Sequence, residues 1–148
     1  MPVASYPELV LRGGPPVHPW IYNKRVLSTD RRVQDGDVVR LKTREGRPCG
    51  FGFALRTSQI AVRVLSYDPD VAPDTAWLRA RVQAAEALRT GLLRLPEVTD
   101  AWRSVNAEGD GLPALGVDRY GDAAVAGLYS IGWMKRADEL TRVLQEVL

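Results

Sequence analysis

Four carboxylates gathered among glycines between Asn106 and Asp122 are the first residues in this chain that could do chemistry. The acids are Glu108, Asp110, Asp118 and Asp122, and the same stretch holds four glycines and one proline. Carboxylate oxygens can bind a divalent cation, but the spacing of a calcium-binding EF-hand loop is absent. Aspartate side chains also accept hydrogen bonds from nearby backbone amides, which stabilises tight turns. The sequence therefore favours turn formation over a metal site, with the loop packed against a neighbouring domain.

A second group combines aromatic rings with cations near the start of the chain, a combination that suits unpaired nucleic acid. Trp20 and Tyr22 can stack on bases, while lysine and arginine side chains reach phosphates. The alternative places Trp20 in a hydrophobic core beside Ile21, the commoner position of such a tryptophan. His18 either contacts RNA or forms a structural hydrogen bond. The candidate RNA-binding residues are Arg12, His18, Trp20, Lys24, Arg25 and Arg56, with Arg31, Arg32 and Arg63 as further cations.

Cys49 and His18 are the only cysteine and the only histidine, so an internal disulfide and a zinc cluster are both excluded. Cys49 lies in a β-rich stretch, which favours a packing role over a catalytic one. Gly109-Asp-Gly111 resembles the start of a dinucleotide-binding loop, but the third glycine is misplaced and a strand follows where a helix should begin. The sequence predicts no catalytic, metal or cofactor site in this chain. A lone cysteine and the lack of a membrane-spanning apolar run predict a cytoplasmic protein.

The charge of the chain changes sign near its middle. Residues 1–67 contain eleven lysines and arginines against five acids, a net charge of +6, whereas the remainder carries −4. A basic segment is typical of nucleic-acid binding, although a solvated charged surface is an equally simple interpretation. Two prolines and three aspartates in residues 68–74 cannot continue a helix or strand. We therefore predict two domains, 1–67 and 75–148, joined by a linker at 68–74.

Alternating patterns predict strands before the linker. Residues 38–42 and 60–64 alternate, and residues 49–55 form an apolar run. Gly46 supplies a turn between the strands at 38–42 and 49–55. Gly50 and Gly52 indicate a bulge or a close approach of another backbone. Several short strands of this kind predict a small barrel or sandwich.

After the linker, the apolar residues follow helical spacing. Leu78, Val82, Ala85, Leu88 and Leu92 predict a helix that begins at Asp74 or Thr75, with Arg79, Gln83, Glu86 and Arg89 on its other side. Residues 101–105 form a strand, and residues 115–119 and 123–129 form a hairpin around Gly121. A final helix is predicted at 134–148, with Ala137, Leu140, Leu144 and Val147 on one stripe. This helix reaches Leu148 without a cap, so we expect the chain to continue in the complete protein.

Several of these motifs together resemble one bacterial enzyme family. They are His18-Pro-Trp-Ile-Tyr22, Gly36-Asp37-Val38, Ser58-Gln-Ile60 with Val62-Arg-Val64, and Glu108-Gly-Asp-Gly-Leu-Pro113 through Val117-Asp-Arg-Tyr120. The resemblance is to the N-terminal part of the S-adenosylmethionine-dependent methyltransferases of cytosine C5 in 23S ribosomal RNA. It implies an α+β fold, namely a small PUA-like RNA-binding β-barrel followed by a short α/β connecting domain, with a Rossmann-like catalytic domain beyond Leu148.

The resemblance also implies which chemistry this chain lacks. Family members place the cysteine that attacks C6 of the base in the C-terminal domain, and S-adenosylmethionine binds there as well. The chain by itself is therefore expected to bind ribosomal RNA without methylating it. The stretch before the His-Pro-Trp motif is often basic in the family but neutral here, which implies that some phosphate affinity is either lost or moved to Arg12, Arg56 and Arg63. The alternative is a free-standing PUA-type interaction protein, and the apolar stripe of the last helix makes a homodimer an expectation.

Overall fold

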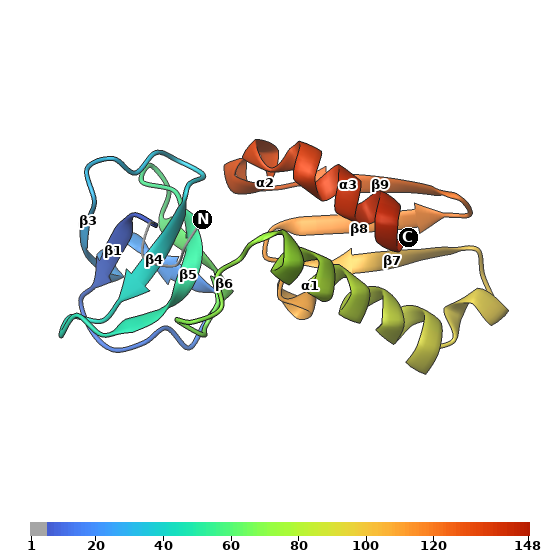
Figure 1. The fold of residues 1–148 in the computed structure, drawn as a ribbon, viewed down its shortest axis with the longest axis horizontal. Helices are drawn as coiled ribbons and strands as arrows, with labels where there is room; N and C mark the ends of the chain where they lie inside the picture. The colour runs from blue at the N-terminus through green and yellow to red at the C-terminus, as the bar shows by residue number, and fades with distance from the viewer. Residues whose placement is uncertain (1–5) are drawn as a thin grey trace. The chain divides into compact units, whose positions relative to one another are not determined.

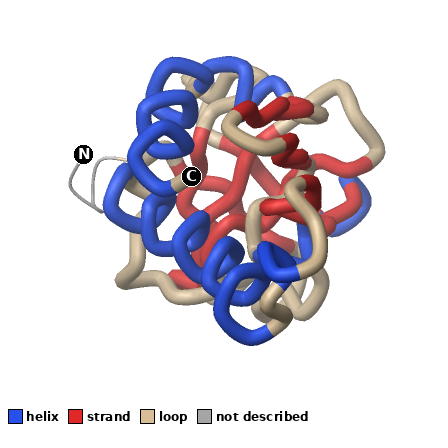
Figure 2. The backbone as a smooth tube through the Cα atoms, turned by 90° about the vertical axis from the view of Figure 1, so that its right-hand side faces the viewer, coloured by secondary structure: helices blue, strands red, loops and turns tan. Residues whose placement is uncertain are grey.

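The computed structural model describes residues 6–148 and contains two compact units, which divide between Asp74 and Thr75. The first, here named the β unit, holds six strands (Figure 1). The second, the αβ unit, holds three strands and the three α-helices of the described chain, which Figure 2 draws in blue together with the shorter helical turns. This content confirms the predicted α+β class. In the described chain, no helix is both long and apolar enough to cross a membrane.

The β unit is one curled sheet. Its strands are β1 (Glu8–Leu11), β2 (Trp20–Tyr22), β3 (Val26–Thr29), β4 (Val38–Lys42), β5 (Pro48–Ala54) and β6 (Ile60–Ser66). Their order is β2-β6-β5-β4-β1-β3, and only the pair β1–β4 is parallel. The edge strands β2 and β3 are nevertheless joined by the three-residue 3-10 turn η2 (Asn23–Arg25). Three residues span at most roughly 10 Å, so the sheet must curl until its two edges nearly meet.

The inside of this curled sheet is the core of the β unit. Strands β1 and β4 alternate between half-buried and buried residues, as a sheet with one covered face requires. The predicted strands at 38–42, 49–55 and 60–64 are confirmed within a residue or two. The core includes Leu9, Leu11, Ile21, Val39, Leu41, Cys49, Val62 and Val64.

The glycines of β5 allow two backbones to approach closely, as predicted. Gly50 has φ +130°, and a Cβ built on it would overlap the carbonyl oxygen of Ser66. A Cβ on Gly52 would overlap the side chain of Val62. The β5–β6 register also shifts between Phe51 and Gly52, which marks the predicted bulge.

The αβ unit combines a small antiparallel sheet with helices. Its elements are α1 (Thr75–Ala87), η3 (Leu88–Leu92), η4 (Leu95–Glu97), β7 (Ala101–Asn106), η5 (Ala107–Asp110), β8 (Leu115–Tyr120), β9 (Ala123–Leu128), α2 (Ile131–Lys135) and α3 (Ala137–Val147). The sheet order is β7-β8-β9, so the predicted hairpin is confirmed and gains β7 as a third strand. Helix α1 packs against α3 and β7 (Figure 1).

The prediction for the first helix was wrong at its C-terminal end. The α-helix stops at Ala87 and continues as a π-helical turn, in which the amide of Leu93 bonds the carbonyl of Leu88. Leu88 and Leu92 are exposed, whereas Glu86 and Arg89, which we expected on the outer face, are buried. Residues 82, 86 and 89 follow helical spacing, so the buried face continues through two charged residues that find ion partners inside the unit.

The final helix is two helices. Helix α2 begins after Ser130, whose hydroxyl accepts a hydrogen bond from the amide of Gly132 at 3.2 Å. The helix is interrupted at Arg136, and α3 starts at the next residue. A continuous helix at 134–148 is therefore a wrong prediction. Leu140 and Leu144 are buried within this unit, so this stripe is not the free surface that the predicted dimer needed.

Candidate nucleic-acid interface

His18, Trp20 and Arg63 lie together where β2 pairs with β6. Trp20 stands opposite Arg63 in the register, and the Arg63 guanidinium carbon lies 5.7 Å from the centre of the indole ring. The His18 ring meets Trp20 edge-on at 5.6 Å, and its Nδ1 accepts the Trp20 backbone amide at 3.0 Å. Trp20 is half-buried while Ile21 is in the core, so the tryptophan keeps some surface for a ligand. His18 forms the structural hydrogen bond that one interpretation of the sequence required.

Lys24 lies on the η2 turn at the end of β2. It is exposed and lines a hollow of about 320 Å³ with Tyr22, Asn23 and Gln59. The amide of Asn23 donates to the carbonyl of Gln59 at 2.8 Å, which fixes η2 against the turn that precedes β6. The Lys24 ammonium therefore projects from a fixed turn beside a half-exposed tyrosine, an arrangement that suits a phosphate next to a base.

Arg25 and Arg12 hold a loop together. The Arg25 guanidinium donates to the carbonyl of Gly14 at 3.1 Å, and its own carbonyl accepts the Arg12 amide at 2.8 Å. Arg25 is half-buried, whereas the Arg12 side chain is exposed. Arg25 thus has a structural task, and Arg12 is the better placed of the two for a phosphate.

Arg56 extends from the turn between β5 and β6. Asp35 fixes that turn, because its carboxylate accepts the Arg56 amide at 2.8 Å and the Thr57 hydroxyl at 3.1 Å. The Arg56 side chain is exposed and lines a pocket that also reaches Asn23. Lys24 and Arg56 therefore border two neighbouring hollows that share Asn23. Asn23 and Gln59 were missed from the sequence, because uncharged amides carry no charge or aromatic signal.

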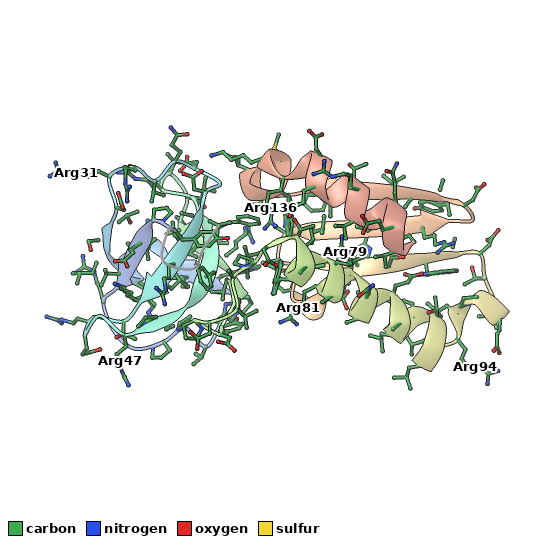
Figure 3. All side chains as sticks on the ribbon, in the orientation of Figure 1. Arg31, Arg47, Arg79, Arg81, Arg94 and Arg136 are labelled. Atoms are coloured by element: carbon green, nitrogen blue, oxygen red, sulfur yellow. The ribbon has the colours of Figure 1, made fainter. Side chains whose placement is uncertain are left out.

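The other cations of the β unit are spread over several loops. Figure 3 shows Arg31 and Arg47 projecting away from the sheet. The Arg32 guanidinium pairs with Asp30 at 2.7 Å, and this hydrogen-bonded contact lowers the pKa of Asp30 to about 2. Arg32 is therefore partly neutralised at neutral pH, which weakens the prediction that it reaches a phosphate.

The acidic loop of the αβ unit builds structure. The Asp110 carboxylate accepts the Asn106 amide at 2.6 Å, which confirms its predicted role in a turn. It also accepts both terminal nitrogens of Arg89, at 2.7 and 2.9 Å, and this pair is almost buried. The same guanidinium donates to the carbonyls of Arg103 and Ala85. Three hydrogen bonds engage Asp110, and the chain continues from Gly111 into β8, so the loop lacks the helix N-terminus that holds phosphate in a dinucleotide-binding loop.

Asp118 and Cys49, two further groups considered for chemistry, are engaged or buried. Asp118 pairs with Arg103 at 2.8 Å, and this contact lowers the pKa of Asp118. Cys49 packs in the core as predicted, and burial raises the pKa of its thiol, which keeps it protonated. Within residues 6–148, no three histidine, cysteine, aspartate or glutamate side chains gather as a metal site would require.

Residues 17–67 match the family model described as a PUA-like domain. The match covers β2 to β6 and all the candidate RNA-binding residues except Arg12. The class of the β unit is therefore PUA-like, in agreement with its curled sheet.

Relatives of known name cover more of the chain. It is 35% identical over 128 residues to ribosomal RNA large subunit methyltransferase I of Shewanella denitrificans, covering 86% of this chain and 32% of the relative. It is also 35% identical over 134 residues to a ribosomal RNA large subunit methyltransferase of Deinococcus radiodurans, covering 88% and 32%. The chain thus spans about a third of the length of the curated relatives it matches.

Solved structures share the fold. A SAM-dependent methyltransferase of Streptococcus mutans aligns with a TM-score of 0.70 and 18% identity, covering 87% of this chain and 33% of that one. A methyltransferase complexed with SAH aligns with a TM-score of 0.71, also at 18% identity. At this identity the likeness concerns the fold alone.

Proposed function

We propose that this chain is the RNA-recognition part of a methyltransferase that modifies cytosine C5 in large-subunit ribosomal RNA. The observation that carries the proposal is the PUA-like match over residues 17–67, which falls within the segment of net charge +6. Cations of this kind release counterions from RNA, so affinity falls steeply as salt rises. The exposed Lys24 and Arg56 on fixed turns supply phosphate contacts, and Trp20 and Tyr22 supply aromatic surface.

The division of labour follows from the same proposal. The β unit binds structured RNA in the cytoplasm, and residues 75–148 connect it to a catalytic domain that supplies the nucleophilic cysteine and binds S-adenosylmethionine. Cys49 cannot supply that thiolate, because it is buried and its pKa is raised. Detectable transfer of a labelled methyl group from S-adenosylmethionine to RNA by residues 1–148 alone would contradict this division.

The binding test compares a double variant of the candidate interface with a control variant. Both are measured in filter-binding titrations with a large-subunit ribosomal RNA fragment at several salt concentrations. We expect Lys24→Ala with Arg56→Ala to weaken binding and to lower the slope of log affinity against log salt by about one per phosphate contact removed. Arg25 is left intact because it holds the Gly14 loop.

The matched control is Arg94→Ala, which removes one exposed cation from the αβ unit, where it pairs with Glu97. The control should leave both affinity and salt slope close to the wild-type values. An unchanged affinity in the double variant, or an equal loss in the control, would overturn the proposed interface.

A second candidate function, a free-standing protein-interaction module, has one observation in its favour. Strand β9 is an edge of its sheet, and Ala124, Val125 and Ala126 on it are exposed. An apolar exposed edge can pair with a strand of another protein. Ribosomal RNA affinity that is absent at low salt would favour this candidate over the first.

A further inference from the structure

A pocket lies at the seam of the curled sheet, where the edge strands β2 and β3 approach each other without pairing. Its volume is about 240 Å³, smaller than the roughly 300–1,000 Å³ of sites for drug-sized ligands. The space therefore suits a ligand of one or two fused rings. The apolar wall consists of Leu9, Val26, Ala54 and Ala61, and the polar groups are those of Asn23, Thr29 and Arg56.

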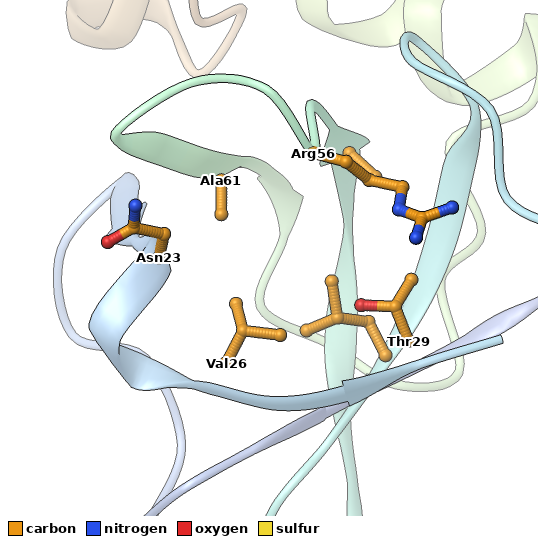
Figure 4. A pocket seen from close by; sticks show the side chains of 7 residues that line it. Asn23, Val26, Thr29, Arg56 and Ala61 are labelled. Carbon is orange, nitrogen blue, oxygen red and sulfur yellow. The ribbon is translucent and has the colours of Figure 1, made fainter. Parts of the chain in front are cut away.

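The wall comes from four strands, which makes the pocket part of the fold. Ala54 and Ala61 are buried on β5 and β6, and their small side chains leave the space open. Figure 4 shows Ala61 and Val26 facing each other across the pocket, with Asn23 at one end and Thr29 and Arg56 at the other. Two apolar sides face to face, with hydrogen-bonding groups at the ends, fit the faces and the edges of a flat heterocycle.

The electrostatics of the rim favour an anion beside that heterocycle. Arg56 borders the pocket, and Lys24 follows Asn23 on η2. The acids close to the pocket residues are already engaged. Glu8, next to Leu9, pairs with Lys42; Asp30, next to Thr29, pairs with Arg32; and Asp35 bonds the turn of Arg56. A base attached to a phosphate backbone carries the flat ring and the anion that this arrangement would take.

We infer that the seam pocket binds one unpaired base of an RNA strand, with Thr29 and Asn23 at its edge and Arg56 on an adjacent phosphate. This inference rests on the proposed function, because it requires that the β unit bind RNA. The inference adds the kind of RNA that is recognised, namely a strand in which at least one base has left its stack and is bound in the pocket.

The test measures the affinity of the whole chain for a single-stranded RNA oligonucleotide containing all four bases. A series of otherwise identical oligonucleotides replaces one nucleotide at a time with an abasic one. Removing the bound base should weaken wild-type binding about tenfold, near the lower end of what the loss of one base–aromatic stack costs, because the pocket wall is aliphatic. Ala61→Leu, which fills the pocket, should weaken binding of the intact strand by a similar factor and make it insensitive to the abasic position.

Thr29→Val keeps the shape of the side chain and removes its hydroxyl, so it tests the pocket even if Ala61→Leu fails to fold. Its control is Ser28→Ala, which removes a hydroxyl from the neighbouring exposed residue of β3. The inference is overturned if RNA binds but both pocket variants match the wild type, or if their losses persist on the abasic strand. Wild-type protein that binds no RNA in any form would overturn the proposed function as well.

Discussion

Replacing Arg89 by methionine should destabilise the αβ unit far more than replacing any exposed arginine. The side chains of Arg89 and Asp110 are 11% and 7% exposed, and they share two hydrogen bonds of 2.7 and 2.9 Å. Methionine keeps most of the length of the side chain but leaves the Asp110 carboxylate buried with the Asn106 amide as its remaining donor among the hydrogen bonds described above. Breaking a buried pair on one side costs about 3–5 kcal/mol of the free energy of unfolding.

The matched control is Arg103→Met, which breaks an exposed pair with Asp118. Its partners are 53% and 33% exposed, and such pairs contribute about 0.2–1 kcal/mol. Urea unfolding followed by far-ultraviolet circular dichroism measures both variants, because the α-helices belong to the αβ unit. The double variant Arg89→Met, Asp110→Leu should recover much of the loss, since an apolar pair leaves no uncompensated charge. Equal losses for Arg89→Met and Arg103→Met would refute a buried pair.

Two further perturbations test each unit separately. Gly50→Ala should prevent folding of the β unit, because the new Cβ overlaps a backbone carbonyl, whereas Gly46→Ala, at φ +83° with open space around it, should cost only about 1 kcal/mol in thermal unfolding. In the αβ unit, hydrogen bonds from Arg136 hold the pKa of Glu139 below its usual 4.5. The ionised Glu139 therefore stabilises the folded state fully at pH values above 4.5, and this stabilisation is lost as pH falls through the lowered folded-state pKa. Glu139→Gln should be less stable than the wild type at neutral pH but closer to it in acid.

Sequence patterns predicted the elements that carry a local signal, either alternating burial or a glycine turn. Residues 38–42 alternate because one face of β4 lines the core, and a glycine turn at Gly121 joins the hairpin strands β8 and β9. Strand β3 has no alternation to read, because it is a four-residue edge whose middle residues are both exposed. The seam pocket depends on β3 and on the strand order, which no local pattern contains.

The candidate site was predictable in composition but not in the task of each residue. Lys24 and Arg56 are exposed, as a charge count suggests, whereas Arg25 bonds a backbone carbonyl eleven residues away. Likewise, Arg89 has its carboxylate partner 21 residues along the chain, so helical periodicity alone placed it on the wrong face. In both cases a tertiary hydrogen bond decided the position of a charged residue.

The glycine-rich loop after β7 is a structural connection between helices. Ala107 and Ala114 have φ of 44° and 59°, conformations that cost a non-glycine residue about 1–3 kcal/mol and persist only where surrounding contacts impose them. Those contacts are identifiable: Asp110 is bonded by Arg89, and the carbonyl of Pro113 accepts the indole N–H of buried Trp133 at 2.7 Å. The loop therefore ties η3, which follows α1, to α2. Asp110 is committed to that task, because Arg89 and the Asn106 amide hold its carboxylate.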